Sequence, residues 1–455
     1  MGHTGIYTFW SRQISHIREE GGVAVWRKLK LLLQLLYRTS RQGFVSLLVI
    51  IKNRKHLLVI IKNIKYMSLF FYVLRNKVNV FLVGNGAIGH YPVNLFLSKL
   101  LYGDNCIYAY KSGVEFANEY LNEKVKQVLK FDPRYEKVID IMKAVSILSS
   151  GIYRFNEFPE QMQMTTSINF AEAFDGRSKL FEFSDDENSV GLEYLSQYDI
   201  NPDKFVCLLV RNDEYYRSIG ITGHLLDRMS YRNPDPKSYN LAVEYLLDLE
   251  YHVIRMGKGF TERFPISHPK FIDYAVSEDR DDFLDIWLVA NCCYCFGSSC
   301  GLVCLPVIFN NPFLAIDVFP QGRMQSWAAK SIFIPSVARK NGELLSLRDM
   351  VELNIIGIVD RKYYKKIGVE IIHNDAEDIL EAVKDMENKI QNGFYVNELN
   401  MLFWKNMRKE WHSGIKTGWS SGGRTFDYFH KINGIKTTIP DFYLKKYHNA
   451  FFDYK

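Results

Sequence analysis

The chain has 455 residues, of which 47% are hydrophobic and 24% charged, and this composition excludes a disordered or fibrous protein. The length is natural for two domains. The net charge of +6 is unevenly placed: residues 1–80 carry 14 Lys or Arg and 2 Asp or Glu, whereas the rest of the chain is mildly acidic. A basic segment attached to an acidic body suits contact with an anionic surface.

Residues 1–77 are predicted to form a basic, amphipathic, helical extension. Apolar residues recur at helical spacing from Trp26 to Leu36, and the run LLVIIKN at 47–53 returns at 57–63. Basic residues interrupt each apolar run before it reaches the roughly 18 residues that a spanning helix needs. We therefore expect this extension to lie on an anionic membrane surface. The alternatives are a helical hairpin packed on the body and an oligomer contact. Nucleic acid is not expected as a partner, because no recognised nucleic-acid motif accompanies the charge.

The start of the sequence and its cysteines both indicate a cytoplasmic protein with free thiols. The first ten residues lack the apolar segment of a signal peptide. The seven cysteines are an odd number, and five of them fall between Cys292 and Cys304. Their spacing does not match a zinc knuckle, so we expect buried core residues and no metal.

Regular α/β structure is predicted to begin at residue 78. A strand at 78–83, a helix at 91–101 and a strand at 106–110 come first, and 112–200 is mostly helical. The turn at 84–89 matches G-x-G-x-x-G. Asp104, however, lies in a turn and not at the end of the next strand, where a dinucleotide-binding loop needs its acid. A loop that admits an acceptor sugar is therefore favoured, with dinucleotide binding as the alternative.

Strands and helices alternate clearly after residue 201, which predicts a doubly wound parallel sheet. The expected strands are 205–210, 251–255, 271–273, 292–296 and 313–316. The expected helices are 237–249, 281–290, 299–309, 376–391 and 397–411. We divide the chain into the extension 1–77, an N-terminal acceptor lobe 78–200, a C-terminal nucleotide-sugar-binding lobe 201–395 and a C-terminal helical segment 396–455.

Ligands of such sheets lie beyond the carboxyl ends of the strands. Arg211 follows the first strand of this region, and a guanidinium binds phosphate oxygens in a bidentate manner. The alternative is a surface ion pair between Arg211 and Asp213.

Two later strand ends carry weaker indications of a ligand site. Arg255 and Gly257 follow the second strand, where a plain turn is the alternative. Ser298 and Ser299 are predicted at a helix N-terminus, which binds anions or is simply capped by a hydroxyl. The loop containing Arg232 and Asn233 faces a ligand or caps a helix, and the sequence leaves both open.

Five segments together resemble a known family. They are 210–216, 231–233, 251–257, 296–302 and the turn 86–90. In order and spacing they are similar to a glycosyltransferase family of bacterial surface-polysaccharide clusters, itself distantly similar to fucosyltransferase-like enzymes. The resemblance implies an α/β fold of two Rossmann-like lobes (GT-B type). Leu209 departs from the related fucosyltransferases, which have a histidine there.

The resemblance implies hexosyl or deoxyhexosyl transfer from a nucleotide-sugar donor to a surface glycan or lipid-linked acceptor. No Asp-x-Asp metal motif lies where it would be needed, so we expect transfer without metal or cofactor, at the cytoplasmic face of the inner membrane. Arg211 would stabilise the leaving diphosphate, and His90, or else Asp213, would accept the acceptor's proton. Pyruvyl transfer on the same fold and a non-catalytic membrane-associated scaffold are the alternatives. The expected substrate-binding residues are Gly86, Gly89, Asn212, Tyr216, Arg232, Asn233, Arg255, Gly257, Gly297, Ser298, Ser299, Gly301 and, at the ribose, Asp285.

Overall fold

The computed structural model describes residues 54–84, 86, 88–89, 91–148, 178–321, 324–326, 328–356, 360–416 and 435–452. The chain divides into two compact units. The first unit comprises 1–85, 102–114 and 129–159, and the second comprises 86–101, 115–128 and 160–455. The domain boundaries expected from the sequence remain predictions, because the two units are built from segments that alternate along the chain. Most of the basic extension, including the first copy of its repeat, lies outside the described residues.

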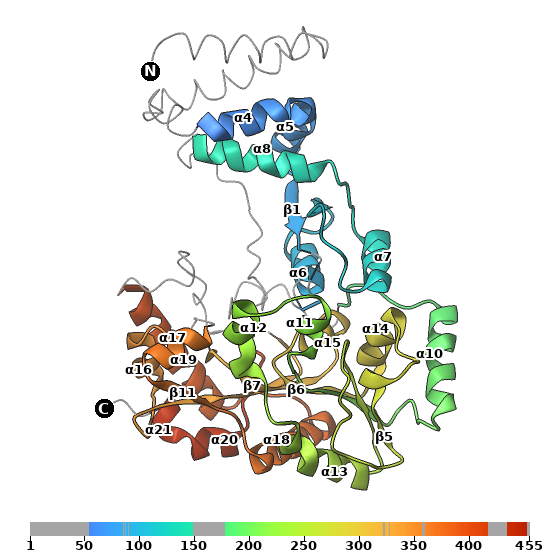
Figure 1. Cartoon of the computed structure of the whole chain (residues 1–455), viewed down its shortest axis with the longest axis vertical. Coiled ribbons are helices and arrows are strands. Elements are labelled where there is room, and N and C mark those ends of the chain that lie inside the picture. The colour runs from blue at the N-terminus through green and yellow to red at the C-terminus, as the bar shows by residue number, and fades with distance from the viewer. Residues whose placement is uncertain are drawn as a thin grey trace. The chain divides into compact units, whose positions relative to one another are not determined.

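The first unit contains a helical layer and a short parallel sheet. Its elements are α4 (Arg54–Lys62), η1 (Ile64–Tyr66), α5 (Met67–Asn76), β1 (Asn79–Val83), β2 (Cys106–Tyr110) and α8 (Tyr135–Leu148). Both predicted strands are confirmed, and they pair in parallel from Asn79 opposite Cys106 to Val83 opposite Tyr110. Helices α4 and α5 pack against α8 (Figure 1). A complete Rossmann-like first lobe remains a prediction, since the described part of this unit pairs two strands.

No single helix in the described residues is long and apolar enough to span a membrane. The pair formed by 55–62 and 64–76, bent by 64° at the break, meets those criteria of length and composition when the two helices are taken together. Its apolar side is occupied by protein, because Ile60, Phe70 and Val73 are buried in the core with Val138 and Ile141 of α8.

The second unit is built on a six-stranded sheet, and it confirms the predicted doubly wound arrangement. The strand order is β5-β4-β3-β6-β7-β8, and all neighbours run parallel. The strands are β3 (Phe205–Leu209), β4 (His252–Arg255), β5 (Phe271–Ile272), β6 (Cys295–Ser298), β7 (Phe313–Val318) and β8 (Ser331–Pro335). Chain order proceeds outward from β3 to β5 and then resumes on the other side of β3 with β6. The order therefore reverses between β3 and β6.

Helices cover both faces of this sheet. Figure 1 shows α13 and α18 on one side and α14 and α15 on the other. The helices up to α14 are α6 (Tyr91–Tyr102), α7 (Glu119–Val128), α10 (Asp185–Gln197), α11 (Glu214–Ser218), α12 (His224–Met229), η3 (Ser230–Arg232), η4 (Pro236–Tyr239), α13 (Asn240–Asp248), η5 (Tyr274–Val276) and α14 (Asp282–Asn291). They are followed by η6 (Leu302–Cys304), α15 (Leu305–Phe309), α16 (Leu347–Glu352), α17 (Arg361–Lys366), α18 (Ala376–Asn392), α19 (Glu398–Lys416), α20 (Asp441–Lys446) and α21 (His448–Phe451).

A small antiparallel sheet completes the second unit. It has the order β10-β9-β11 and comprises β9 (Val337–Lys340), β10 (Glu343–Leu344) and β11 (Val369–Ile372). Neither this sheet nor β8 was predicted.

The predicted strand 292–296 and helix 299–309 are both misplaced. The strand is Cys295–Ser298, and regular helix begins at Leu302. At the end of α14 the Asn311 amide donates to the carbonyls of Val289, Ala290 and Cys292, each at 3.0 Å. The backbone N–H of Cys292 also donates to the Leu288 carbonyl, so Cys292 belongs to the helix end, and the strand extends to Gly297 and Ser298.

Candidate functional site

A cavity of about 330 Å³ lies in the second unit, and most of its lining follows the carboxyl ends of sheet strands. Arg211 and Asn212 follow β3, Gly257 follows β4, and Ser299 follows β6. The cavity is thus at the place where the strand order reverses. In open α/β sheets this crevice is where ligands bind.

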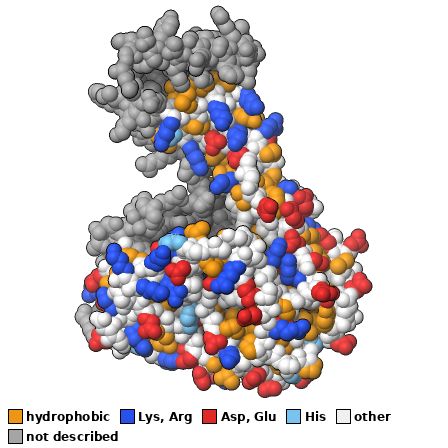
Figure 2. Space-filling model, viewed as in Figure 1, with side chains coloured by type: hydrophobic (Ala, Val, Ile, Leu, Met, Phe, Trp, Pro, Cys, Tyr) orange, Lys and Arg blue, Asp and Glu red, His pale blue; other side chains and the backbone are white. Residues whose placement is uncertain are grey.

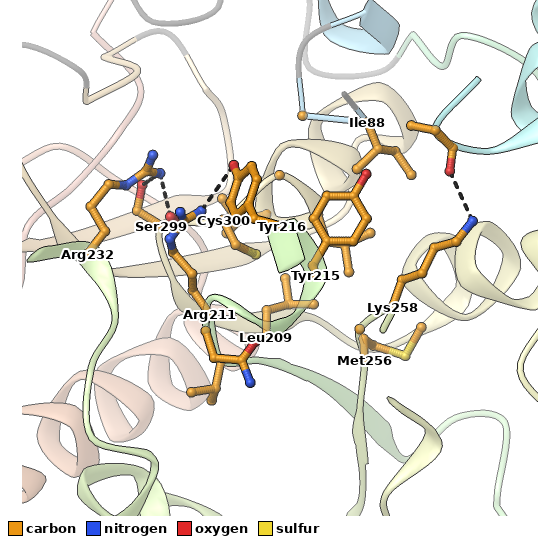
Figure 3. A pocket seen from close by; sticks show the side chains of 18 of the residues that line it. Ile88, Leu209, Arg211, Tyr215, Tyr216, Arg232, Met256, Lys258, Ser299 and Cys300 are labelled. Carbon is orange, nitrogen blue, oxygen red and sulfur yellow. Dashed lines mark hydrogen bonds between the residues drawn. The ribbon is translucent and has the colours of Figure 1, made fainter. Parts of the chain in front are cut away.

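Arg211 enters the cavity in a fixed orientation (Figure 3). Its backbone N–H donates to Ser298 Oγ at 2.7 Å, and its Nε donates to Asn233 Oδ1 at 3.1 Å. The guanidinium lies 4.9 Å from the centre of the Tyr216 ring, close enough for a cation–π contact. The residue is 6% exposed, and its buried Nη2 has no hydrogen-bond partner among the described residues. One donor of the fork is therefore left over for a ligand.

Arg232 lies beside Arg211. Its Nη2 donates to the carbonyl oxygen of Ser299 and, at 2.9 Å, to Ser299 Oγ. Burial and the neighbouring positive charge of Arg211 both lower the pKa of Arg232. Within the described parts of the chain, no carboxylate pairs with either guanidinium. Two adjacent, partly desolvated cations without a counter-charge form a strong anion-binding arrangement.

The structure thus joins Arg211, Arg232 and Ser299, which lie far apart in the sequence. The alternative ion pair between Arg211 and Asp213 is not formed, because Arg211 is engaged by Asn233 and Tyr216. Both readings of the loop 232–235 hold: Arg232 lines the cavity and reaches across to Ser299, while Asp235 caps η4 by accepting from the backbone N–H of Lys237 at 3.0 Å.

The serines behave differently from the helix-terminus site that we predicted. Ser298 is fully buried in β6, and its hydroxyl accepts from Arg211 and lies 3.4 Å from the Leu209 carbonyl. Ser299 lines the cavity, and regular helix begins later than predicted, at Leu302, which lines the cavity together with Gly301. Ser299 therefore contributes to the site through its contacts with Arg232 and does not cap the helix.

Two glycines of the cavity wall are explained by close backbone contact. A Cβ added to Gly89 would come within 2.6 Å of Gly301 Cα, and one added to Gly301 would lie 3.1 Å from Gly89 N. The turn 86–89 and the loop after β6 therefore need glycine where they touch. Both glycines line the cavity together with Gly86.

The remaining predicted ligand residues divide into two groups. Asn212, Tyr216, Gly257 and Asp285 line the cavity with those already described. Gly297, Ser298, Asn233 and Arg255 do not line it. Asn233 acts on the site through Arg211, whereas Arg255 is 4% exposed and forms an ion pair with Asp273 at 3.1 Å. A charged residue that follows a strand can thus be neutralised by an ion pair within the protein, and it is then not available to a ligand.

The candidate proton acceptors differ in whether they line the cavity. His90 lies outside the described residues. Asp213 precedes α11 and is not part of the cavity lining. Asp285 is the acid in the lining: its Oδ2 accepts from Arg280 at 2.6 Å, while its buried Oδ1 has no hydrogen-bond partner in the described part of the chain. Burial raises the pKa of Asp285 to about 6, although the Arg280 guanidinium acts in the opposite direction.

Most of the lining was not foreseen, because it is apolar. It includes Tyr215, Ile219, Ile221, Met229, Met256, Phe260, Leu302, Val318 and Phe333, together with the polar Lys258 and Gln325. In the sequence these side chains resemble ordinary core residues. Only the loop positions next to Arg211, Tyr215 among them, carry an indication that could have revealed them.

Three of the cysteines converge in the core, and none of the three lines the cavity. The sulfur atoms of Cys207, Cys292 and Cys295 all lie within 4.8 Å of one another, and those of Cys292 and Cys295 are 3.5 Å apart. Spacing alone did not predict this, since Cys292 belongs to the end of α14 and Cys207 to β3. Burial raises the pKa of Cys207 and Cys295, whereas hydrogen bonds with those two thiols lower the pKa of Cys292, although its own burial acts in the opposite direction.

No protein-family model matches the chain, and no curated protein matches it. Among solved structures, the crystal structure of the glycosyl transferase family 9 from Veillonella parvula DSM 2008 is similar, at 10% sequence identity and a TM-score of 0.37. The similarity covers 69% of this chain and 98% of that chain. At this TM-score it assigns neither fold nor function to the chain.

Proposed function

We propose that this protein is a glycosyltransferase that moves a sugar from a nucleotide-sugar donor to a hydroxyl of a surface glycan or lipid-linked acceptor. The observation that carries the proposal is the pair of arginines, Arg211 and Arg232, at the strand-order reversal of a parallel sheet. They lack a counter-charge among the described residues, and one donor of Arg211 is left unpartnered. The sequence resemblance described above supports sugar transfer among the reactions that release a diphosphate.

The two arginines would act on the leaving group. When the bond from the sugar to the diphosphate breaks, the electron pair stays on the diphosphate oxygen and its negative charge increases. Donors already in place stabilise that charge more in the transition state than in the ground state, and one such donor contributes about 3 kcal/mol. Asn233 and Ser299 keep both guanidinium groups in position, so little reorganisation is needed on binding.

The acceptor hydroxyl must lose its proton as it attacks the sugar. His90 is our first proposal for the base, with Asp213 as the second. We also propose that the transfer needs no metal, because the arginines provide the positive charge that a cation would otherwise supply.

Binding of diphosphates tests the proposal before the donor sugar is known. Isothermal titration calorimetry would compare pyrophosphate, nucleoside diphosphates, nucleoside monophosphates and phosphoenolpyruvate. We expect diphosphates to bind, and Arg211→Ala or Arg232→Ala each to weaken binding by roughly 10- to 100-fold, the value of a hydrogen bond to a charged group. Arg217→Ala, which removes an exposed arginine of the neighbouring α11, is the matched control and should bind normally.

Arg211→Lys covers the case in which the alanine variant fails to fold. It keeps the charge but removes the bidentate fork, so it should retain the circular dichroism spectrum and still lose affinity. Binding of phosphoenolpyruvate without diphosphates would instead favour pyruvyl transfer. A folded protein that binds none of these anions would favour the non-catalytic scaffold.

A further inference from the structure

Helices α4 and α5 present two unlike faces. One face is buried: Ile60, Ile64, Met67, Phe70 and Val73 are all less than 7% exposed and pack in the core of the first unit. The second copy of the LLVIIKN repeat therefore lies largely in a helix that packs against protein. Such packing was expected under the alternative of a helical hairpin packed on the body. These apolar side chains are not free to insert into a bilayer.

The opposite face is basic. Lys55, Leu58, Lys62 and Lys65 follow one another at intervals of three and four residues, and all are exposed. Tyr72 and Arg75 continue the exposed side along α5. Figure 2 shows blue and orange side chains together on this helical layer. We call these six residues the α4–α5 basic face.

No acidic residue interrupts this face in the sequence. Residues 54–80 contain neither Asp nor Glu. Within the described residues, the cations of the basic face form no ion pair, and the Lys65 ammonium lies 5.3 Å from the ring centre of Tyr66. A set of unpaired cations on a rigid support produces a local positive potential that extends about one Debye length, roughly 8–10 Å, into solution.

We propose that the α4–α5 basic face binds the surface of a membrane rich in anionic lipid. The cations supply the attraction, because each Lys or Arg close to an anionic leaflet contributes to binding. Leu58 and Tyr72, which are 37% and 45% exposed, lie among the cations. Leu58 adds an apolar side chain to the face, and Tyr72 adds an aromatic ring of the kind that lies at membrane interfaces. This mixture favours a lipid interface over nucleic acid. The two helices would lie on the bilayer, since their main apolar side is already occupied by protein.

Vesicle co-sedimentation of the full-length protein tests the proposal. Phosphatidylcholine vesicles with and without phosphatidylglycerol would be compared at low and high salt. We expect binding only to the anionic vesicles, with loss of binding at high salt as screening increases. A triple variant with Lys55→Glu, Lys62→Glu and Lys65→Glu should bind at least about 100-fold more weakly, which corresponds to the loss of three surface cations.

A matched control carries the same charge change elsewhere. Lys362→Glu, Lys365→Glu and Lys366→Glu alter three exposed lysines of α17, and this variant should bind vesicles like the wild type. The proposal is overturned if the α4 variant binds as tightly as the control, or if neutral vesicles bind equally well. It is also overturned if single-stranded RNA displaces the protein from vesicles and the α4 variant loses as much affinity for RNA as for vesicles.

These outcomes do not depend on the proposed enzymatic activity. Pyrophosphate binding by the second unit can be measured in the same variants. A variant that loses vesicle binding and keeps pyrophosphate binding separates the two proposals.

Discussion

Arg211 is oriented by its neighbours before any ligand arrives. Asn233 accepts from its Nε, Ser298 accepts from its backbone N–H, and Tyr216 covers its guanidinium. A long side chain normally loses rotamer freedom on binding, at a cost of about 0.5–1.5 kcal/mol. Here that cost is met when the chain folds, so an anion encounters a prepared donor. The same logic explains why Asn233 matters to the site without lining the cavity.

Asp285 leads to a prediction about pH at the residue scale. Its pKa is about 6 in the folded chain against an ordinary value of 3.8, so the folded chain holds this proton more tightly than the unfolded one. The resulting stabilisation is complete below pH 4 and is lost as the pH rises through 6. The difference between the two pKa values corresponds to a change in the free energy of unfolding on the order of 3 kcal/mol.

Urea denaturation of the wild type and Asp285→Asn at a series of pH values measures this effect. The stability of the wild type relative to the variant should fall by roughly that amount between about pH 4 and pH 7. Asp186→Asn, which removes an exposed carboxylate in the first turn of α10, serves as the control. If the stability difference between the wild type and Asp285→Asn stays constant over this range, the pKa of Asp285 is not raised in the folded chain.

At the scale of elements, the site depends on how closely β3 and β6 approach at their ends. Gly297 in β6 lies opposite Leu209 in β3 and has a φ of +149°, which side chains rarely tolerate. A Cβ there would lie 2.0 Å from the carbonyl oxygen of Leu209. Arg211 is only two residues after Leu209, so this contact between β3 and β6 also positions the backbone of Arg211 in the anion site.

Gly297→Ala is therefore expected to destabilise the protein by about 3 kcal/mol or more, because both the backbone strain and the clash with β3 must be accommodated. Gly342→Ala is the matched control: Gly342 also has a positive φ, of +84°, but nothing lies within 4 Å of the added Cβ. It should cost only about 1 kcal/mol. Thermal unfolding of the two variants makes the comparison, and equal losses of stability would contradict the close approach.

At the scale of the whole molecule, the two proposed functions belong to different compact units. The arginine pair is in the second unit and the α4–α5 basic face is in the first. Each function rests on its own set of contacts: the anion site on the sheet, and the basic face on the packing of α4 and α5 against α8. A change in one unit should therefore leave binding by the other intact.

Hydrogen exchange followed by mass spectrometry would show this separation. Pyrophosphate should slow amide exchange in the loops after β3 and β6, which contain Arg211 and Ser299, and leave α4 and α5 unchanged. Anionic vesicles should do the reverse. If pyrophosphate protected α4 and α5 as strongly as the site loops, the assignment of the anion site to the second unit alone would be wrong.

The alternation of strands and helices after residue 201 could be predicted from local sequence, and so could the places where charged residues follow strands. Apolar runs of strand length separated by amphipathic helices have one stable solution, a parallel sheet covered on both faces. The sequence also determined the basic character of the N-terminal region, because charge can be counted without coordinates.

Which of those charges form a site depends on contacts between distant parts of the chain. Arg211 and Arg255 look alike in the sequence, each at the end of a buried strand, yet Arg255 pairs with Asp273 and Arg211 stands beside Arg232. Likewise, the Asn311 amide binds the last carbonyls of α14, and the strand and helix that follow begin later than the local sequence indicated. The physical reason is the same in both cases: a side chain takes its role from partners that are distant in the chain, and local sequence does not name them.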